Sequence, residues 1–362
     1  MKTLLFTLAA SISFNSLIAQ EEEKTPNPLT ISGYVEVYYN YDFNRPVNNT
    51  APGFLYNFNR TGEVNLNLGY IKANYKNERV RANLALAAGS YMNANYAAEA
   101  GILKNVFEAN VGVKLAKNAN LWLDAGIMPS HIGFESAVGR DNWALTRSLV
   151  AENTPYFESG VKLGYTTEDG KLYLAAMYLN GWQRIQRVDG NSSPAFGTQF
   201  TYKPSESVTL NYSTFIGNDK PDSVRQTRIY HNFYGIMQLS EKWGLTAGFD
   251  YGMEQKAKGS RQYNNWFVPV MIVRYTASPK LSFAARGEYF SDEKEVIITT
   301  GSNNGFRTTG VSVNMDYALF DKVLWRLEVR RLSSNDALFA KKTNEGFGRN
   351  NLFATTSLSI VF

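Results

Sequence analysis

Cysteine is absent from this chain of 362 residues, which excludes disulfide scaffolds and thiol chemistry. Histidine is nearly absent as well, with only His131 and His231, and no group of histidine and acidic residues has the spacing of metal ligands. His231 has no Gly-x-Ser-x-Gly motif near it that would support a Ser–His–acid hydrolase. The sequence therefore predicts no metal site, no cofactor and no enzyme activity.

A long apolar run is also missing after the N-terminal segment, so the sequence predicts no transmembrane helix, which needs about 18 or more apolar residues. A membrane location stays open, because the strands of a transmembrane barrel mix polar with apolar residues and give a weak hydropathy signal. Basic runs are missing too. The formal net charge is only +5, and a nucleic-acid partner is not expected.

Aromatic residues, by contrast, are abundant, with 22 tyrosines and 22 phenylalanines, as expected where aromatic girdles lie at membrane interfaces. From residue 29 onward, segments of about 9–14 residues alternate apolar with polar side chains, as antiparallel transmembrane strands do. About sixteen such segments occur: 29–41, 63–76, 79–89, 104–116, 119–128, 155–167, 171–180, 194–203, 206–217, 227–239, 242–253, 262–277, 280–290, 304–319, 321–332 and 351–362. Pro269 interrupts one segment and lacks a ladder donor, so we expect a local bulge or distortion there.

The gaps between these segments alternate without exception between short turns and long loops. The long gaps are residues 42–62, 90–103, 129–154, 181–193, 218–226, 254–261, 291–303 and 333–350. Successive hairpins of a membrane barrel end on opposite sides of the membrane, with short periplasmic turns and longer outer loops. We therefore predict an all-β fold, a transmembrane antiparallel up-and-down barrel over residues 29–362. About 16 strands leave a water-filled channel rather than a packed interior.

The strand segments place their charges on one face. In residues 321–332, Arg326, Glu328 and Arg330 share the face opposite to Trp325. A charge on the lipid face costs about 2–4 kcal/mol at mid-bilayer, so these side chains are predicted to line the lumen. The same parity gives further candidates for a charged pore lining: Arg81, Glu158, Lys162, Arg286 and Glu288. An ion pair between neighbouring strands is the alternative for each of them.

The longest loop, residues 129–154, is the third long one. Five candidate constriction residues lie in it: His131, Glu135, Arg140, Asp141 and Arg147. A connection of this length is usually functional or disordered, and its aromatic residues, such as Phe134 and Trp143, argue against disorder. We expect the loop to fold into the lumen and to constrict the pore. An outward loop that only covers the mouth is the alternative.

The N-terminal segment has the features of a secretory signal. Lys2 precedes an apolar stretch that is too short to span a membrane. We predict a Sec-type signal peptide over residues 1–19 and a short lead-in over residues 20–28, so that the mature chain leaves the cytoplasm. Cleavage after Ala19 places Leu17 at the −3 position, where a small residue is preferred.

Three motifs and the last residue carry a resemblance to a known family. ISGYVEVYYNYDFN (31–44) opens the first strand, GIMPSHIGFES (126–136) and NTPYFESGVKLGY (153–165) flank the longest loop, and Phe362 ends the chain. With these features the chain resembles the OmpL-like β-barrel porin family over nearly its whole mature length. The resemblance implies passive diffusion of small hydrophilic solutes and ions across a Gram-negative outer membrane. A substrate-specific channel, or a non-conducting outer-membrane scaffold, is the alternative.

The resemblance also implies partners. Phe362 looks like the signal read by the machinery that assembles outer-membrane barrels. Such a barrel lies among outer-membrane lipids and lipopolysaccharide. General diffusion porins are similar in strand number and in an inward third loop, and many of them are homotrimers, which makes a homotrimer an expectation by analogy.

Overall fold

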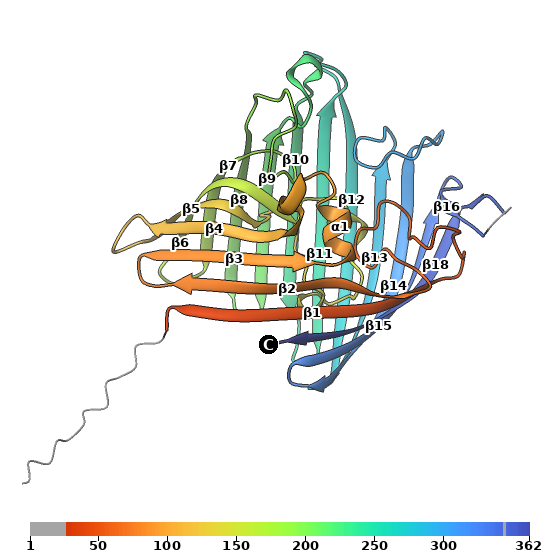
Figure 1. Cartoon of the computed structure of the whole chain (residues 1–362), viewed down its shortest axis with the longest axis horizontal. Helices are drawn as coiled ribbons and strands as arrows, with labels where there is room; N and C mark the ends of the chain where they lie inside the picture. The colour runs from red at the N-terminus through yellow and green to blue at the C-terminus, as the bar shows by residue number, and fades with distance from the viewer. Residues whose placement is uncertain (1–26, 343–344) are drawn as a thin grey trace, which may run out of the picture.

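The computed structural model describes residues 27–342 and 345–362, and sixteen of its strands form one closed antiparallel barrel (Figure 1). Each barrel strand pairs with the next one along the chain, and the first pairs with the last. The predicted fold class and strand number are confirmed. The predicted signal peptide, residues 1–19, lies outside the described residues.

The barrel strands are β1 (Leu29–Asp42), β2 (Val64–Lys76), β3 (Val80–Ala88), β4 (Val106–Lys114), β5 (Asn120–Pro129), β6 (Phe157–Thr166), β7 (Leu172–Leu179), β8 (Ala195–Ser205), β9 (Val208–Gly217), β10 (Arg228–Gln238), β11 (Trp243–Gln255), β12 (Tyr263–Ser278), β13 (Leu281–Asp292), β14 (Phe306–Phe320), β15 (Val323–Ser334) and β18 (Asn350–Val361). In the loop before β18, two short strands pair with each other: β16 (Phe339–Ala340) and β17 (Phe347–Gly348). The helices are α1 (Ser90–Asn95), α2 (Leu149–Glu152) and the 3-10 helices η1 (Gly101–Asn105), η2 (Gly139–Asp141) and η3 (Asp222–Val224). None of the described helices is long and apolar enough to cross a membrane.

The strands keep their register at Pro269, so no bulge forms there, but the ladder is locally distorted on one side. Pro269 pairs with Phe249 of β11 in an unbroken ladder. Toward β13, the pairing skips residues 268–269 and resumes at Val270 in the same register, and the shift between these two strands occurs at Thr276 instead. Strand β12 therefore loses two ladder pairs to β13 at the proline, and no extra residue is inserted.

The two faces of the wall follow the predicted parity. In β15, Trp325 and Leu327 are exposed on the outside, whereas Arg326 and Glu328 point inward and are buried. The outside is apolar along strand after strand, and hydrocarbon accommodates such a surface where water does not. The inside carries the polar and charged side chains on which a channel depends.

The ring closes between the two ends of the described chain. The N–H of Gly33 donates to the carbonyl oxygen of Phe362 at 2.8 Å, and the N–H of Phe362 donates back at 3.1 Å. From Tyr34 opposite Val361, the pairing of β1 with β18 continues without a break to the outer end of both strands. No edge strand of the barrel is left to pair with another chain.

Two glycines mark the place where the longest loop leaves the wall. Gly126 of β5 and Gly160 of β6 are paired in the ladder. A Cβ atom at Gly126 would lie 2.2 Å from the carbonyl oxygen of Ala109, and one at Gly160 would lie 2.0 Å from that of Tyr178. Gly126 also has a φ of 125°, which side chains disfavour. Both belong to the sequence motifs that flank the loop, and close strand approach is the physical reason for glycine there.

We predict that Gly126→Ala lowers the free energy of unfolding by about 1–3 kcal/mol, the cost of a strained backbone residue. The matched control is Gly287→Ala in β13, where a Cβ atom would meet nothing within 4 Å. Urea unfolding of both variants in phospholipid vesicles measures the difference. Equal midpoints for the two variants would contradict the role of Gly126.

Candidate pore constriction

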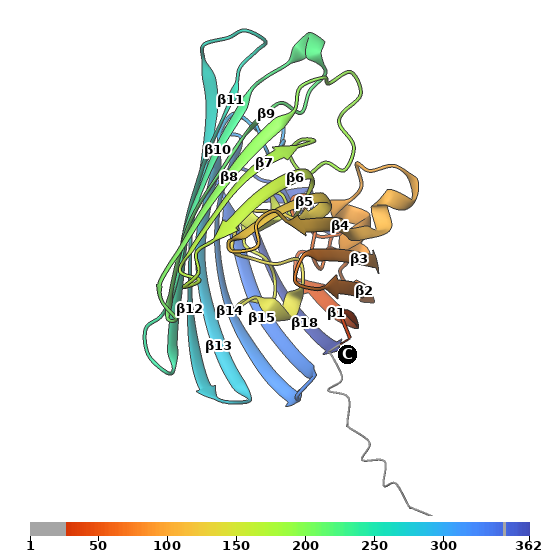
Figure 2. The ribbon, with the colours of Figure 1, turned by 90° about the vertical axis from the view of Figure 1, so that its left-hand side faces the viewer.

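Loop 3, residues 130–156 between β5 and β6, leaves its own wall and crosses the lumen. Its middle part binds side chains of β13 and β15. Around the ring, eight strands separate β5 from β14 in one direction and six in the other, so these contacts lie on the opposite wall. Figure 2 shows this yellow segment inside the barrel, beside the blue strands. Loop 3 therefore takes up part of the lumen.

The first anchor of loop 3 is His131, whose ring is buried. Its Nδ1 lies 2.5 Å from a carboxylate oxygen of Glu158, and its Nε2 lies 2.8 Å from the carbonyl oxygen of Thr214. Both partners are acceptors, so the ring donates to both only in its imidazolium form, with a proton on each nitrogen. Burial lowers the pKa of His131, but the Glu158 carboxylate and the hydrogen bonds outweigh burial and raise it above 6.5.

The second anchor is a group of four charged side chains on the opposite wall, which we call the anchor cluster: Arg286 and Glu288 of β13, with Glu328 and Arg330 of β15. Arg286 donates to Glu328 at 2.8 Å, and Arg330 donates to Glu288 at 2.5 Å. All four side chains are 0% exposed. The ion pairs reach across β14, whereas the sequence had suggested pairs between neighbouring strands.

The anchor cluster holds loop 3 by its backbone. The two glutamates accept from the N–H groups of Thr146 and Leu149, at 2.6 and 2.5 Å. The two arginines donate to the carbonyl oxygens of Thr146 and Arg147, at 2.6 and 2.9 Å. Backbone groups of an irregular loop need partners wherever water is excluded. The cluster supplies them, and so fixes this part of the loop to the wall.

Strand β14 permits this cluster because its inward side chains are small. Gly310 pairs with Glu288 in the ladder, and a Cβ atom at Gly310 would lie 2.5 Å from that carboxylate. Ser312 pairs with Arg286 on one side and with Arg330 on the other. In the sequence, this cluster could have been found from Gly310 and Ser312, two small residues on a strand between two charged strands. Our prediction considered each strand by itself and therefore missed it.

Two further arginines fasten loop 3 toward the short-turn end of the barrel. Arg326 donates to the carbonyl oxygen of Gly139 at 2.6 Å, while Asp316 holds its guanidinium at 2.6 Å. Arg140 donates to the carbonyl oxygens of residues 321–322, in the turn between β14 and β15, at 2.8 and 2.9 Å. The loop thus reaches from the outer side to the opposite end of the lumen.

Two predicted constriction residues act inside loop 3 itself. Arg147 is fully buried and donates to the carbonyl oxygens of Leu145, Ser136 and Ala137. Glu135 accepts from the N–H of Ser148 at 3.1 Å and also from its hydroxyl group. Burial raises the pKa of Glu135 even though nearby arginines oppose the shift. These two side chains shape the loop and are almost completely buried.

Loop 1, residues 43–63, packs on loop 3 through a contact that sequence analysis missed. The Glu152 carboxylate accepts from the N–H groups of Tyr56 and Asn57, at 2.8 and 3.2 Å. Burial raises the pKa of Glu152 to about 7, although these hydrogen bonds and Arg147 lower it. The partners of Glu152 are mainly backbone groups, so no pattern of residue types pointed to this contact.

The remaining predicted charges reach open space from the opposite part of the wall. Four side chains form what we call the basic strip: Lys72 of β2, Arg81 of β3, Lys114 of β4 and Lys162 of β6. Lys72 and Arg81 are 26% and 31% exposed, whereas their carboxylate partners, Glu108 and Asp124, are only 9% and 7% exposed. The other two basic side chains are half-buried, and Asp141 of loop 3 is exposed.

A cavity of about 380 Å³ lies between loop 3 and this wall. It is lined by Lys72 and Glu108 of the wall and by residues 132–138 and Asp141 of the loop. Within residues 27–342 and 345–362, no group of three or more histidine and acidic side chains is placed to hold a metal ion. The arrangement offers a cavity of mixed polar and apolar lining beside a fixed loop.

Comparisons with known proteins agree with this architecture. A family model described as "Putative beta-barrel porin-2, OmpL-like" matches residues 28–362. In-vitro folded OmpT, an outer membrane protein of Vibrio cholerae, is 12% identical with a TM-score of 0.58, covering 92% of this chain and 97% of that chain. An anion-selective porin from Comamonas acidovorans is 9% identical with a TM-score of 0.61, covering 92% and 99%. A trimer form of OmpT is 11% identical with a TM-score of 0.59, covering 92% and 99%. No curated protein matches the sequence.

We predict that Glu328→Gln frees loop 3 while the barrel stays closed. The substitution removes the carboxylate 2.8 Å from Arg286 and leaves only Glu288, at 3.3 Å, and Glu135, at 4.0 Å; breaking a buried pair costs about 3–5 kcal/mol. Limited proteolysis of the folded barrel in detergent, with cleavage sites mapped by mass spectrometry, measures cleavage within residues 130–156. The control is Asp124→Asn, which breaks the ion pair to Arg81 on the other wall. Equal cleavage in both variants would refute the anchoring role.

A second prediction concerns pH. The pKa of His131 is raised in the folded protein, so its anchoring contribution is complete below about 6.5 and is lost as pH rises through the folded value. We expect cleavage of loop 3 to increase over that window, because the neutral ring keeps only one N–H. His131→Gln should remove the pH dependence. The protease is calibrated on an unstructured peptide at each pH, and a flat profile for the unmodified chain would contradict the prediction.

Proposed function

Starting from the OmpL-like β-barrel porin-2 family, to which this chain belongs, we propose that this outer-membrane channel for small solutes works by passive diffusion past loop 3, with a preference for anions. The barrel supplies the water-filled path. Loop 3 narrows that path, and Lys72 of the basic strip lines the cavity that remains beside it. Family and fold both point to a channel rather than to an enzyme.

The observation that carries the proposal is how loop 3 is held. It is tied at His131 to β9, and on the opposite wall by the anchor cluster and by Arg326 of β15. A loop held in this way narrows the lumen permanently and needs no gating step. Width then limits the size of the solute, and the charges on the passage select among ions.

Exposure of the basic strip supports the preference for anions. Its ammonium and guanidinium groups meet open space, while Glu108 and Asp124 beside them are nearly buried. Paired charges of the anchor cluster are sealed from water and contribute little to the field in the passage. The similar porin from Comamonas acidovorans is described as anion-selective, in keeping with this proposal.

The assembly partners follow from the family and belong to the same proposal. We infer that the N-terminal 19 residues direct Sec-dependent export, and that Phe362 is read by the barrel assembly machinery. The mature barrel then lies among lipid and lipopolysaccharide. The similarity to a trimer form of OmpT supports a homotrimer for this chain.

We predict stepwise ion currents from the refolded protein in a planar bilayer. In a potassium chloride gradient, an anion-preferring pore makes the concentrated side positive at zero current. Lys162→Glu should move this potential toward cation preference, and Lys171→Glu, in the exposed turn between β6 and β7, serves as the control. Absence of current steps would refute the channel, and a negative concentrated side would refute the anion preference.

The narrowing role of loop 3 is tested in the same bilayer. Deletion of residues 136–150 should raise the single-channel conductance, because it removes the part of loop 3 that lies across the lumen. The anchor cluster keeps its internal ion pairs in this variant, so the wall retains paired charges. An unchanged conductance would show that loop 3 does not limit the flow.

A further inference from the structure

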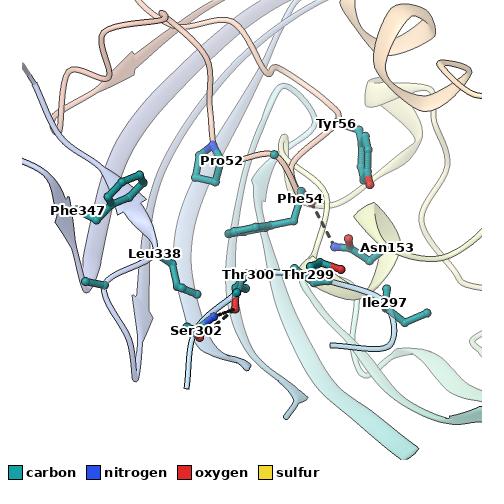
Figure 3. A pocket seen from close by; sticks show the side chains of 14 residues that line it. Pro52, Phe54, Tyr56, Asn153, Ile297, Thr299, Thr300, Ser302, Leu338 and Phe347 are labelled. Atoms are coloured by element: carbon teal, nitrogen blue, oxygen red, sulfur yellow. Dashed lines mark hydrogen bonds between the residues drawn. The ribbon is translucent and has the colours of Figure 1, made fainter. Parts of the chain in front are cut away.

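A second cavity, of about 560 Å³, lies on the long-loop side of the barrel and is separate from the passage beside loop 3. Figure 3 shows the side chains around it, which come from loop 1, from the loop between β13 and β14, and from the loop between β15 and β18. Its size falls within the range of small-molecule sites, about 300–1,000 Å³.

One side of this cavity is apolar and partly rigid. Phe54 is nearly buried, and its ring packs edge-on against Phe306 with centroids 4.7 Å apart. Phe347 lies across the cavity in Figure 3 and is 64% exposed, while Pro52 and Leu338 lie between the two rings. An exposed phenylalanine facing a fixed one offers apolar faces to a guest that arrives from water.

The other side is a row of hydroxyl groups that act mainly as acceptors. Thr300 donates its hydroxyl proton to Glu295, and Ser302 donates to the carbonyl oxygen of Gly305 at 3.0 Å. Thr300 already accepts from the N–H of Ser302 at 3.2 Å, so its second lone pair and those of Ser302 remain to accept hydrogen bonds. The neighbouring Thr299 is exposed and adds a hydroxyl that can either donate or accept. A guest that fits this side must bring hydroxyl donors of its own.

Charge is missing from the lining. All fourteen lining residues are neutral, so a charged guest would lose hydration without gaining an ionic partner. Neutral character, several hydroxyl donors and apolar C–H faces together describe a sugar ring. We propose that this cavity binds a short neutral saccharide at the outer entrance of the channel. The inference deepens the proposed function by naming one class of solute.

The cavity lies next to loop 3, whose Asn153 is one of its lining residues. A neighbouring cavity of about 340 Å³ shares Tyr56, Asn153 and Ile297 with it and is also lined by Glu152 of loop 3. A saccharide held at the outer cavity therefore lies next to the segment that narrows the pore. Binding there raises the local concentration of the sugar at the entrance.

The direct test is isothermal titration of the refolded barrel in detergent with maltose and with maltobionate, which has the same linkage but carries a carboxylate. We expect maltose to bind and maltobionate to bind more weakly. Phe347→Ala should raise the half-saturating maltose concentration about fivefold through loss of one aromatic face. The control is Phe43→Ala, an aromatic residue 54% exposed near the outer end of β1 that does not line the cavity.

Thr299→Val is the second variant, because it removes a hydroxyl group at nearly constant volume and should also weaken maltose binding. No heat with maltose, or stronger binding of maltobionate than of maltose, overturns the saccharide site. Equal effects of Phe347→Ala and Phe43→Ala overturn its location. A barrel that conducts ions yet does not bind maltose leaves the proposed channel intact and refutes only this inference. A barrel that binds maltose but gives no current steps keeps this inference and refutes the proposed channel.

Discussion

Every backbone N–H and C=O group that leaves water needs a hydrogen-bonding partner, and the whole architecture depends on this requirement. The wall meets it by closing β1 onto β18, so that each strand has two neighbours. Loop 3 faces the same requirement inside the lumen, where no ladder is available to it. Carboxylates and guanidinium groups of the wall take the place of a ladder, by accepting from its N–H groups and donating to its carbonyl oxygens.

A buried group of four charges is costly on its own, since each charge gives up its hydration. In the anchor cluster the cost is offset in two ways. Each arginine faces a glutamate within 2.8 Å, and each of the four charges also binds the backbone of loop 3. The cluster has no net charge and is most stable with the loop in place. The wall and loop 3 therefore stabilise one another, because each lacks hydrogen-bonding partners without the other.

The sequence predicted the wall far better than the contents of the lumen. Strand β15 was expected at 321–332 and lies at Val323–Ser334, because alternation and the cost of charge in lipid act within a few residues. Parity also placed Arg286 and Arg330 on the inside correctly. Whether an inward charge meets water or a loop depends on contacts between distant segments, such as Arg286 with Thr146, 140 positions apart. For the same reason, no sequence pattern predicted the contact of Glu152 with loop 1.

Which way a charged side chain points and whether water reaches it are two separate properties, and the difference affects the electrostatics of the proposed pore. Strand parity alone turns as many acids as bases toward the lumen, which gives no ion preference. The bases are Arg81, Lys114, Lys162, Arg286, Arg326 and Arg330, and the acids are Glu36, Glu108, Asp124, Glu158, Glu288 and Glu328. The structure distributes them unequally: the anchor cluster is neutral and sealed, while the half-exposed groups of the basic strip lie on the opposite wall. A sealed ion pair gives only a weak field at a distance, whereas a cationic group at the water boundary attracts anions directly. In the proposed pore, loop 3 covers one charged wall and leaves the basic strip, together with the exposed Asp141 of the loop, to act on the solute.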